Sequence, residues 1–292
     1  MQTIRYLTAV FLVLGLFAGT TPALQNPPGA IPSKLVKVRD DLYMIENVNP
    51  TVADIGAYGG NIAVYLTDEG VILVDSKNER TYDDVVAKIR SLTDKPIKYV
   101  VLTHNHADHA AGAAKFQALG AAVIISEDDR ENIARTANAA WIPSFGYMGQ
   151  AQITMGGKEA RLYEFRGHTR GDTVIHFPAA RVIAMGDLLT TSEGIPLIVN
   201  YSDGGSWTDW RKSVDEILKL DFDIAIPGHG PMVTKQQVAD IRKKMSAIIE
   251  RVHAMNQERK TQQEITAALL KEFDWGTGPS AGNIPGMMQE LR

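Results

Sequence analysis

IKYVVLTHNHADH, residues 97–109, joins a short apolar run to three histidines and an aspartate. The run Ile97–Thr103 predicts a buried strand, and the Ala-rich stretch 109–119 predicts a helix. The histidines therefore follow the carboxyl end of a strand, where α/β folds place their ligands. His104 and His106 alternate in an extended segment and point the same way, whereas Asp108 and His109 follow as the chain turns.

Three later side chains can complete two metal sites. His168, Asp187 and His229 each follow a glycine at the end of a strand-like run. A tetrahedral zinc binds imidazole or carboxylate ligands at about 2.0–2.2 Å. We expect one ion at His104, His106 and His168, a second at Asp108, His109 and His229, and Asp187 between them. Two ions about 3.5–4 Å apart can activate water and stabilise the oxygens of a transition state.

The two remaining histidines have patterns typical of structural residues. His176 lies inside a strand pattern, two residues before Pro178. His253 lies on a late helix among charged residues. We expect neither of them at the metal site.

Composition limits the classes of partner. The chain has 292 residues, of which 45% are hydrophobic and 22% charged, as is ordinary for a globular protein. Its formal net charge is −4 and it contains no basic run, which argues against a nucleic-acid partner. It has no cysteine, so neither a disulfide nor a thiolate ligand is available.

The first residues indicate export. Arg5 precedes the apolar run 7–18 and a small-residue stretch that ends at Ala23. This order is typical of a signal peptide, which we place at residues 1–23. The Pro-rich residues 24–33 form a flexible lead-in, and residues 34–292 form the catalytic domain. We therefore expect a periplasmic or secreted protein with no stable membrane anchor after cleavage; its oligomeric state stays open.

Strand and helix patterns alternate along the rest of the chain. Strands are predicted at 42–48, 61–67, 71–75, 97–103, 121–126, 162–166, 173–177, 182–185 and 222–226. Helices are predicted at 81–92, 109–119, 127–138, 206–220, 235–256 and 262–273, with Ser206 as an N-cap. The mixture predicts a layered α/β domain. The Gly- and Pro-rich residues 276–292 allow no assignment.

The motifs together resemble those of the metallo-β-lactamase superfamily over about residues 40 to 240. They are Asp75 at the end of VILVDS, THNHADH at 103–109, GHT at 167–169, GDL at 186–188 and PGHG at 227–230. The resemblance implies a single-domain, four-layer αββα sandwich with the metal site at one edge of two packed sheets. It also implies that Asp75 orients a ligating histidine without binding metal itself.

The resemblance leaves several substrates open. Zinc β-lactamases usually carry Cys or Ser where Asp187 stands, and a bridging Asp is more similar to lactonases and to thioesterases of the glyoxalase II kind. Those lactonases place a Tyr where this chain has Thr190, and the basic C-terminal region of glyoxalase II is absent from the sequence. We favour a dinuclear zinc hydrolase that opens a β-lactam or a related cyclic amide or ester, with a lactonase or thioesterase as the alternative.

Two further alternatives concern the chemistry itself. A mononuclear iron oxygenase of this superfamily would use two histidines of the first site and the bridging Asp, and a non-catalytic periplasmic accessory protein would use neither site. The hydrolase interpretation assigns Asp108 a catalytic role, because it both binds metal and guides a proton. The small-molecule pocket is expected among residues 55–60, 141–148 and 195–207, with Tyr58, Tyr147 or Tyr201 as a possible phenol.

Overall fold

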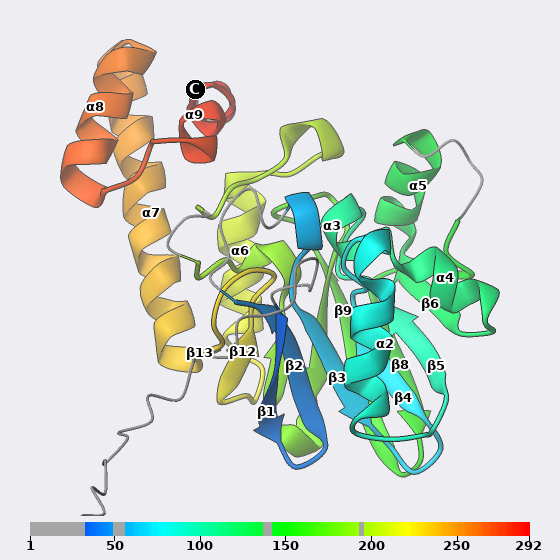
Figure 1. Ribbon diagram of the computed structural model, residues 1–292. Coiled ribbons are helices and arrows are strands. Elements are labelled where there is room, and N and C mark those ends of the chain that lie inside the picture. The colour runs from blue at the N-terminus through cyan, green and yellow to red at the C-terminus, as the bar shows by residue number, and fades with distance from the viewer. Residues whose placement is uncertain (1–32, 49–55, 137–141, 193–195) are drawn as a thin grey trace, which may run out of the picture. The chain divides into compact units, whose positions relative to one another are not determined.

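The computed structural model describes residues 33–48, 56–136, 142–192 and 196–292 (Figure 1). Two β-sheets face each other, and helices cover both outer faces. The predicted signal peptide, residues 1–23, lies outside the described residues, as does the lead-in up to residue 32. Regular structure begins at Ser33 with strand β1.

The first sheet has seven strands in sequence order. They are β1 (Ser33–Arg39), β2 (Leu42–Asn47), β3 (Ile62–Leu66), β4 (Val71–Val74), β5 (Ile97–Val101), β6 (Ala122–Ser126) and β7 (Phe145–Tyr147). Neighbours from β1 to β4 are antiparallel, and those from β4 to β7 are parallel. The parallel strands place their carboxyl ends at one edge, where the histidine-rich segment follows β5.

The second sheet has six strands in the order β13-β12-β11-β10-β9-β8. They are β8 (Gln150–Met155), β9 (Lys158–Phe165), β10 (Asp172–Phe177), β11 (Val182–Ala184), β12 (Ile224–Ile226) and β13 (Val233–Thr234). The pair β11–β12 is parallel and the other pairs are antiparallel. Side chains of both sheets, such as Met44 and Phe177, fill the core between them.

Helices on the two outer faces complete four layers. The first sheet packs on α2 (Tyr82–Arg90), α3 (Ala107–Ala110), α4 (Ala113–Ala118) and α5 (Glu127–Thr136). The second packs on α6 (Trp207–Ile217), α7 (Lys235–Gln257), α8 (Gln262–Phe273) and α9 (Pro279–Glu290). This is the expected αββα sandwich in a single α/β domain.

Most predicted elements are present, and Ser206 is confirmed as the N-cap of α6, because its side chain accepts a hydrogen bond from Asp209 N. One helix over 109–119 is a wrong prediction, since α3 and α4 are separate helices. The helix is interrupted at Gly112, whose N–H donates to Lys77 O at 3.0 Å. A Cβ there would lie 2.3 Å from Ser76 O, so the close approach requires glycine.

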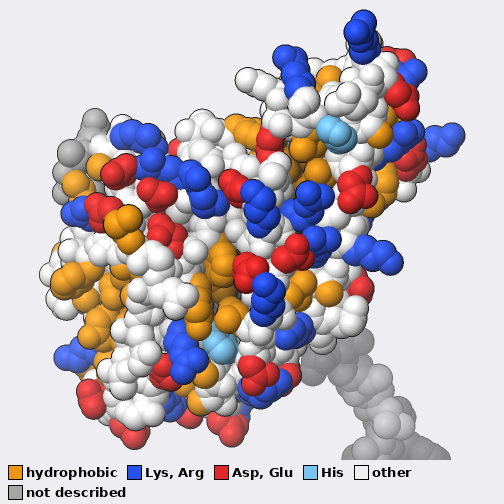
Figure 2. Space-filling view, turned by 180° about the vertical axis from the view of Figure 1, so that it is seen from behind, with side chains coloured by type: hydrophobic (Ala, Val, Ile, Leu, Met, Phe, Trp, Pro, Cys, Tyr) orange, Lys and Arg blue, Asp and Glu red, His pale blue; other side chains and the backbone are white. Residues whose placement is uncertain are grey.

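The surface carries charges of both signs. Figure 2 shows basic and acidic side chains interspersed on the face opposite that of Figure 1. Within the described part of the chain, no helix has the length and apolar character needed to cross a bilayer.

Candidate metal centre

Seven side chains meet at the edge where β5, β9, β11 and β12 end. His104 and His106 lie between β5 and α3, Asp108 and His109 lie in α3, and His168 follows β9. Asp187 lies in the short helix η3 (Gly186–Leu188) after β11, and His229 follows β12. Both sheets therefore contribute to one cluster.

The side chains form two groups that share Asp187. The first group is His104, His106, His168 and Asp187, and the second is Asp108, His109, Asp187 and His229. Within each group the candidate ligand atoms lie within 4.8 Å of one another. The grouping has the same membership as the two sites inferred from the sequence.

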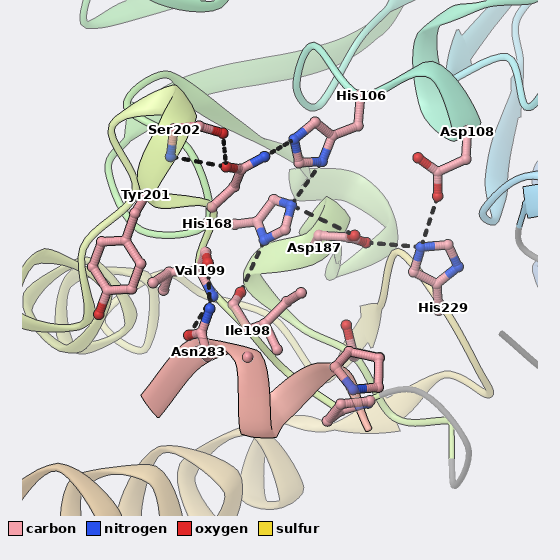
Figure 3. Close-up of a pocket in the computed structure, with 15 residues that line it drawn as sticks. His106, Asp108, His168, Asp187, Ile198, Val199, Tyr201, Ser202, His229 and Asn283 are labelled. Atoms are coloured by element: carbon pink, nitrogen blue, oxygen red, sulfur yellow. Dashed lines mark hydrogen bonds and ion pairs between the residues drawn. The ribbon is translucent and has the colours of Figure 1, made fainter. Parts of the chain in front are cut away.

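Asp187 faces both groups with its two oxygens. Its Oδ1 lies 3.3 Å from Nε2 of His109 and 3.3 Å from Nε2 of His229. Its Oδ2 lies 3.7 Å from Nε2 of His168 (Figure 3). The carboxylate is thus placed to bridge two cations.

The first group fits a cation, because ring nitrogens face one another at close range. His106 Nδ1 and His168 Nε2 lie 3.0 Å apart. The opposite nitrogen of His168, Nδ1, lies 2.9 Å from the acceptor Ile198 O. His106 Nε2 lies 3.0 Å from Asp203 Oδ2 and 2.7 Å from Asn200 Nδ2. When each outer nitrogen carries the proton, the inner nitrogens point lone pairs at each other. A metal ion between them resolves that repulsion.

His104 adds a third inward nitrogen to this group. Its Nδ1 lies 3.0 Å from Thr103 Oγ1, which itself donates to Asp75 Oδ2. Its Nε2 is buried and finds no hydrogen-bond partner among the described residues. An unpaired buried acceptor costs free energy unless it binds a cation, so the group fits zinc chemically.

Asp75 contacts the second group through the outer ring nitrogen of His109. Its Oδ1 accepts from Thr103 N at 2.7 Å, and its Oδ2 lies 2.8 Å from His109 Nδ1. His109 Nε2 then faces His229 Nε2 at 3.2 Å. Asp75 therefore orients a histidine and lies outside both groups, as the resemblance implies.

Burial and charge prepare the histidines as ligands. Burial lowers the pKa of His168 to about 4 and holds the pKa of His104 well below its usual value, so both rings are neutral. Burial also opposes a proton on His109, but the carboxylates of Asp187, Asp108 and Asp75 raise its pKa well above the usual value. A cation can replace that proton, because ligands must release protons to bind metal.

Two glycines allow the backbone to approach the ligands. A Cβ on Gly60 would lie 2.3 Å from His109 Cε1, and a Cβ on Gly228 would lie 1.9 Å from Asp187 Oδ1. Only hydrogen fits at either position. The glycine before His229 in the sequence therefore has a steric reason.

The loop after η3 belongs to the segment 195–207 that was expected at the pocket, but the sequence did not indicate its two contacts with His106. Asp203 accepts from Asn200 Nδ2 at 2.9 Å and lies beside His106. Both residues lie in or next to the short helix η4 (Tyr201–Asp203). No spacing rule connects positions 200–203 with His106, so only the fold reveals this contact.

A pocket of about 480 Å³ opens beside the two groups (Figure 3). Its lining includes His106, Asp108, His168, Asp187 and His229, residues 196 and 198–202, and residues of α9. The expected contribution of 195–207 is therefore present. Among the described residues of 141–148, β7 instead joins the first sheet beside β6.

The three tyrosines have different surroundings. Tyr147 donates to Thr173 Oγ1 at 2.8 Å, and the Tyr58 ring lies under the guanidinium of Arg80. Tyr201 lines the pocket, but its hydroxyl donates to Glu290 Oε2 at 3.0 Å. Each of these three side chains therefore already has a partner within the described structure.

The other two histidines lie away from the cluster. His176 Nε2 lies 3.0 Å from Asp221 O, and His253 Nδ1 lies 2.9 Å from Leu291 O. Both make backbone contacts typical of structural residues.

Comparison with known proteins adds the family. The model of the metallo-beta-lactamase superfamily matches residues 55–229. A metallo-beta-lactamase type 2 from Elizabethkingia meningoseptica is 25% identical over 225 residues, which cover 76% of this chain and 86% of that protein. The 2,4-dinitroanisole O-demethylase subunit alpha from Nocardioides sp. (strain JS1661) is 28% identical over 169 residues, 56% of this chain. This match spans only 50% of the demethylase subunit.

Solved structures show the same fold. A metallo-beta-lactamase from Pontibacter korlensis superimposes with a TM-score of 0.64 and 19% identity, over 73% of this chain and 99% of that one. Helices α7 to α9 lie beyond the residues that the family model matches.

Proposed function

Because this chain belongs to the metallo-β-lactamase superfamily, whose members are generally metal-dependent hydrolases, we propose that it is a dinuclear zinc hydrolase. Its substrate class is a cyclic amide or ester, with β-lactams and lactones as the two candidates. The observation that carries the proposal is Asp187, which lies within 3.7 Å of histidines from both groups.

Each of the two groups would hold one zinc ion. His104, His106 and His168 would bind the first, and Asp108, His109 and His229 the second, with Asp187 shared. Zinc in such a site lowers the pKa of water and polarises a carbonyl. A complete second group supports this chemistry over a mononuclear iron oxygenase, which needs only the first.

The protein residues would position the substrate and move protons. Asp108 lines the pocket, and its Oδ2 lies 3.2 Å from His229 Nε2. Burial opposes ionisation of Asp108, but the nearby imidazoles of His109 and His229 lower its pKa. It is therefore a carboxylate that can accept the proton of the attacking water and pass it to the leaving atom. The pocket wall would hold the ring against this edge and keep bulk water away.

Replacement of Asp108 tests the proposal. We expect zinc-loaded protein to open a β-lactam or an acyl-homoserine lactone, and Asp108→Ala to reduce kcat/KM by about 100-fold or more. Metal analysis of the variant separates loss of the proton carrier from loss of zinc. Asp94→Ala, an exposed change outside the site, is the control. Full activity in Asp108→Ala, or no turnover of either ring by the wild type, would overturn the proposal.

We also propose a periplasmic or secreted location and a small-molecule substrate. The order of residues in 1–23 supports export, and the interspersed surface charges give no support to a nucleic-acid partner. Cell fractionation and N-terminal sequencing of the mature protein would test the location; an N-terminus at Leu24 is the expected result.

A further inference from the structure

The pocket beside the metal centre has no Lys or Arg among the described residues that line it. We propose that the part of the substrate next to the scissile carbonyl is uncharged and largely apolar, as in a lactone, ester or amide without a free carboxylate there. This inference rests on the proposed hydrolytic function and narrows its substrate class.

Two segments build the wall opposite the metal ligands. Pro196 and residues 198–202 come from the loop after η3. Residues Pro279, Gly282 and Asn283 come from α9, which runs below the labelled histidines in Figure 3. Pro196, Ile198, Val199 and Pro279 offer only apolar surface, which favours apolar groups of a ligand.

The side-chain amides of Asn283 and Asn200 in the wall already form hydrogen bonds within the protein. Asn283 Oδ1 accepts from Trp207 Nε1 at 2.7 Å and from Val199 N at 3.2 Å, while its Nδ2 donates to Val199 O at 2.7 Å. Asn200 Oδ1 accepts from Ser202 N at 3.0 Å, and its Nδ2 donates to Asp203. These contacts hold the wall in place and leave the amides few hydrogen bonds for an anion.

Two lysines close to the metal centre or its pocket are engaged elsewhere. The Lys77 side chain is fully buried, and its Nζ donates to Asn47 Oδ1 at 2.8 Å and to Gly60 O. Lys244 lines a neighbouring groove, where Asp240 and Asp274 also lie. The internal segments outside the described residues, 49–55, 137–141 and 193–195, contain no Lys or Arg in their sequence. Neither the described wall nor those segments can pair with a substrate carboxylate.

The metal centre itself has little positive charge to spare. Asp108 and Asp187 lie in the cluster, Asp75 contacts His109, and Asp203 contacts His106. These four carboxylates would balance the charge of two zinc ions. An anionic group in the pocket would therefore lose hydration without gaining a counter-ion, which is costly.

A matched pair of substrates tests the inference. A chromogenic cephalosporin with its ring carboxylate and the methyl ester of the same compound share one scissile bond and one chromophore. We expect the zinc-loaded protein to cleave the ester with a kcat/KM about tenfold or more above that of the acid. Cleavage of both compounds with an equal or greater rate for the acid would overturn the inference and leave the proposed function standing.

A cation added to the wall should shift this preference. Ser202 is exposed at the pocket, so Ser202→Lys can place an ammonium beside the substrate. We expect the acid-to-ester ratio of kcat/KM to rise about threefold to fivefold, the effect of one exposed ion pair. Ser91→Lys adds the same charge beyond the end of α2, and we expect no change in the ratio there. An unchanged ratio in Ser202→Lys would count against the inference.

Binding without turnover gives an independent measurement. Calorimetric titration of the metal-free wild type and of metal-free Ser202→Lys with both compounds measures affinity in the absence of cleavage. Asp108 and Asp187 repel the acid equally in both proteins, so the difference between the proteins reports the added lysine alone. We expect Ser202→Lys to tighten binding of the acid relative to the ester. If zinc-loaded protein cleaves neither compound and also leaves an acyl-homoserine lactone intact, the proposed function fails. Tighter binding of the acid than of the ester by the zinc-loaded wild type would overturn the inference.

Discussion

Lys77 is a lysine buried in the domain core, close to the metal centre. Its side chain is fully buried and donates to Asn47 Oδ1 and Gly60 O. Burial lowers the pKa of Lys77 to about 7. A buried ammonium destabilises the folded state below pH 7. Above pH 7 the folded state releases the proton, while the unfolded chain keeps it up to about pH 10.4.

The free energy of unfolding should therefore rise with pH through this group. Between pH 7 and 9 we expect a gain of about 2 kcal/mol from Lys77 in metal-free protein, because the unfolded state then binds the extra proton. Lys77→Met should remove that gain, although it also lowers stability at every pH by leaving two acceptors unpaired. Urea unfolding at both pH values measures the difference. Lys212→Met, at an exposed position, should keep the wild-type slope, and the same slope in Lys77→Met would contradict the expectation.

Residues differ in how far the sequence could predict their roles. The set of candidate ligands could be predicted because HNHADH is dense in residue types that bind metals and the later candidates follow strand ends. Asn200 and Asp203 could not, since they reach His106 only across a folded loop. The burial of Lys77 was equally hidden, because Lys is rarely buried and no local pattern marks the exception.

Helix α9, which lines the pocket, is attached to the N-terminus of α6 through Glu290. Its Glu290 accepts from Ser206 Oγ at 2.7 Å and from Thr208 N at 2.7 Å through Oε1, and from Trp207 N at 3.1 Å through Oε2. These donors belong to the N-terminus of α6, which favours a negative charge. Burial opposes ionisation, but the hydrogen bonds lower the pKa of Glu290.

Glu290→Gln should weaken this connection. We expect a loss of about 1–2 kcal/mol in the free energy of unfolding at neutral pH. Because the folded pKa is lowered, the contribution of the carboxylate is present above about pH 4.3, the unfolded value, and is lost as the pH falls through the folded value. Denaturant unfolding at pH 7 and pH 3 measures both. Glu258→Gln on the exposed turn after α7 is the control, and an equal effect there would refute the anchoring role of Glu290.

Elements were predictable where their patterns are regular. Strands β5, β6 and β10 are short apolar runs, and the long α7 has apolar residues at helical spacing. Strand β7 has only three residues, and α9 contains Gly282, Pro285 and Gly286, which normally interrupt helices. Tertiary packing of Ile284 and Met287 on the second sheet's helices overrides those preferences.

On the scale of the whole molecule, the cluster of histidines and aspartates connects the two sheets. His104, His106, Asp108 and His109 follow a strand of the first sheet, whereas His168, Asp187 and His229 follow strands of the second. Single motifs could therefore suggest ligands, but only the packing of one sheet on the other brings them within reach. The same packing means that metal binding should stabilise the domain and not only the local loops.

Metal removal tests that consequence. Zinc at about 1,000 times its Kd should raise the free energy of unfolding by about 4 kcal/mol for each bound ion relative to chelated protein, since the unfolded chain lacks the assembled site. His104→Ala and His229→Ala should each reduce the bound zinc from two ions to about one and remove part of that gain. The reason is that the two residues belong to different groups. His253→Ala, outside the cluster, should bind and respond to zinc like the wild type. Loss of both ions in either ligand variant would show that the two groups fill only together, and zinc without effect on unfolding would contradict a cluster that joins the sheets.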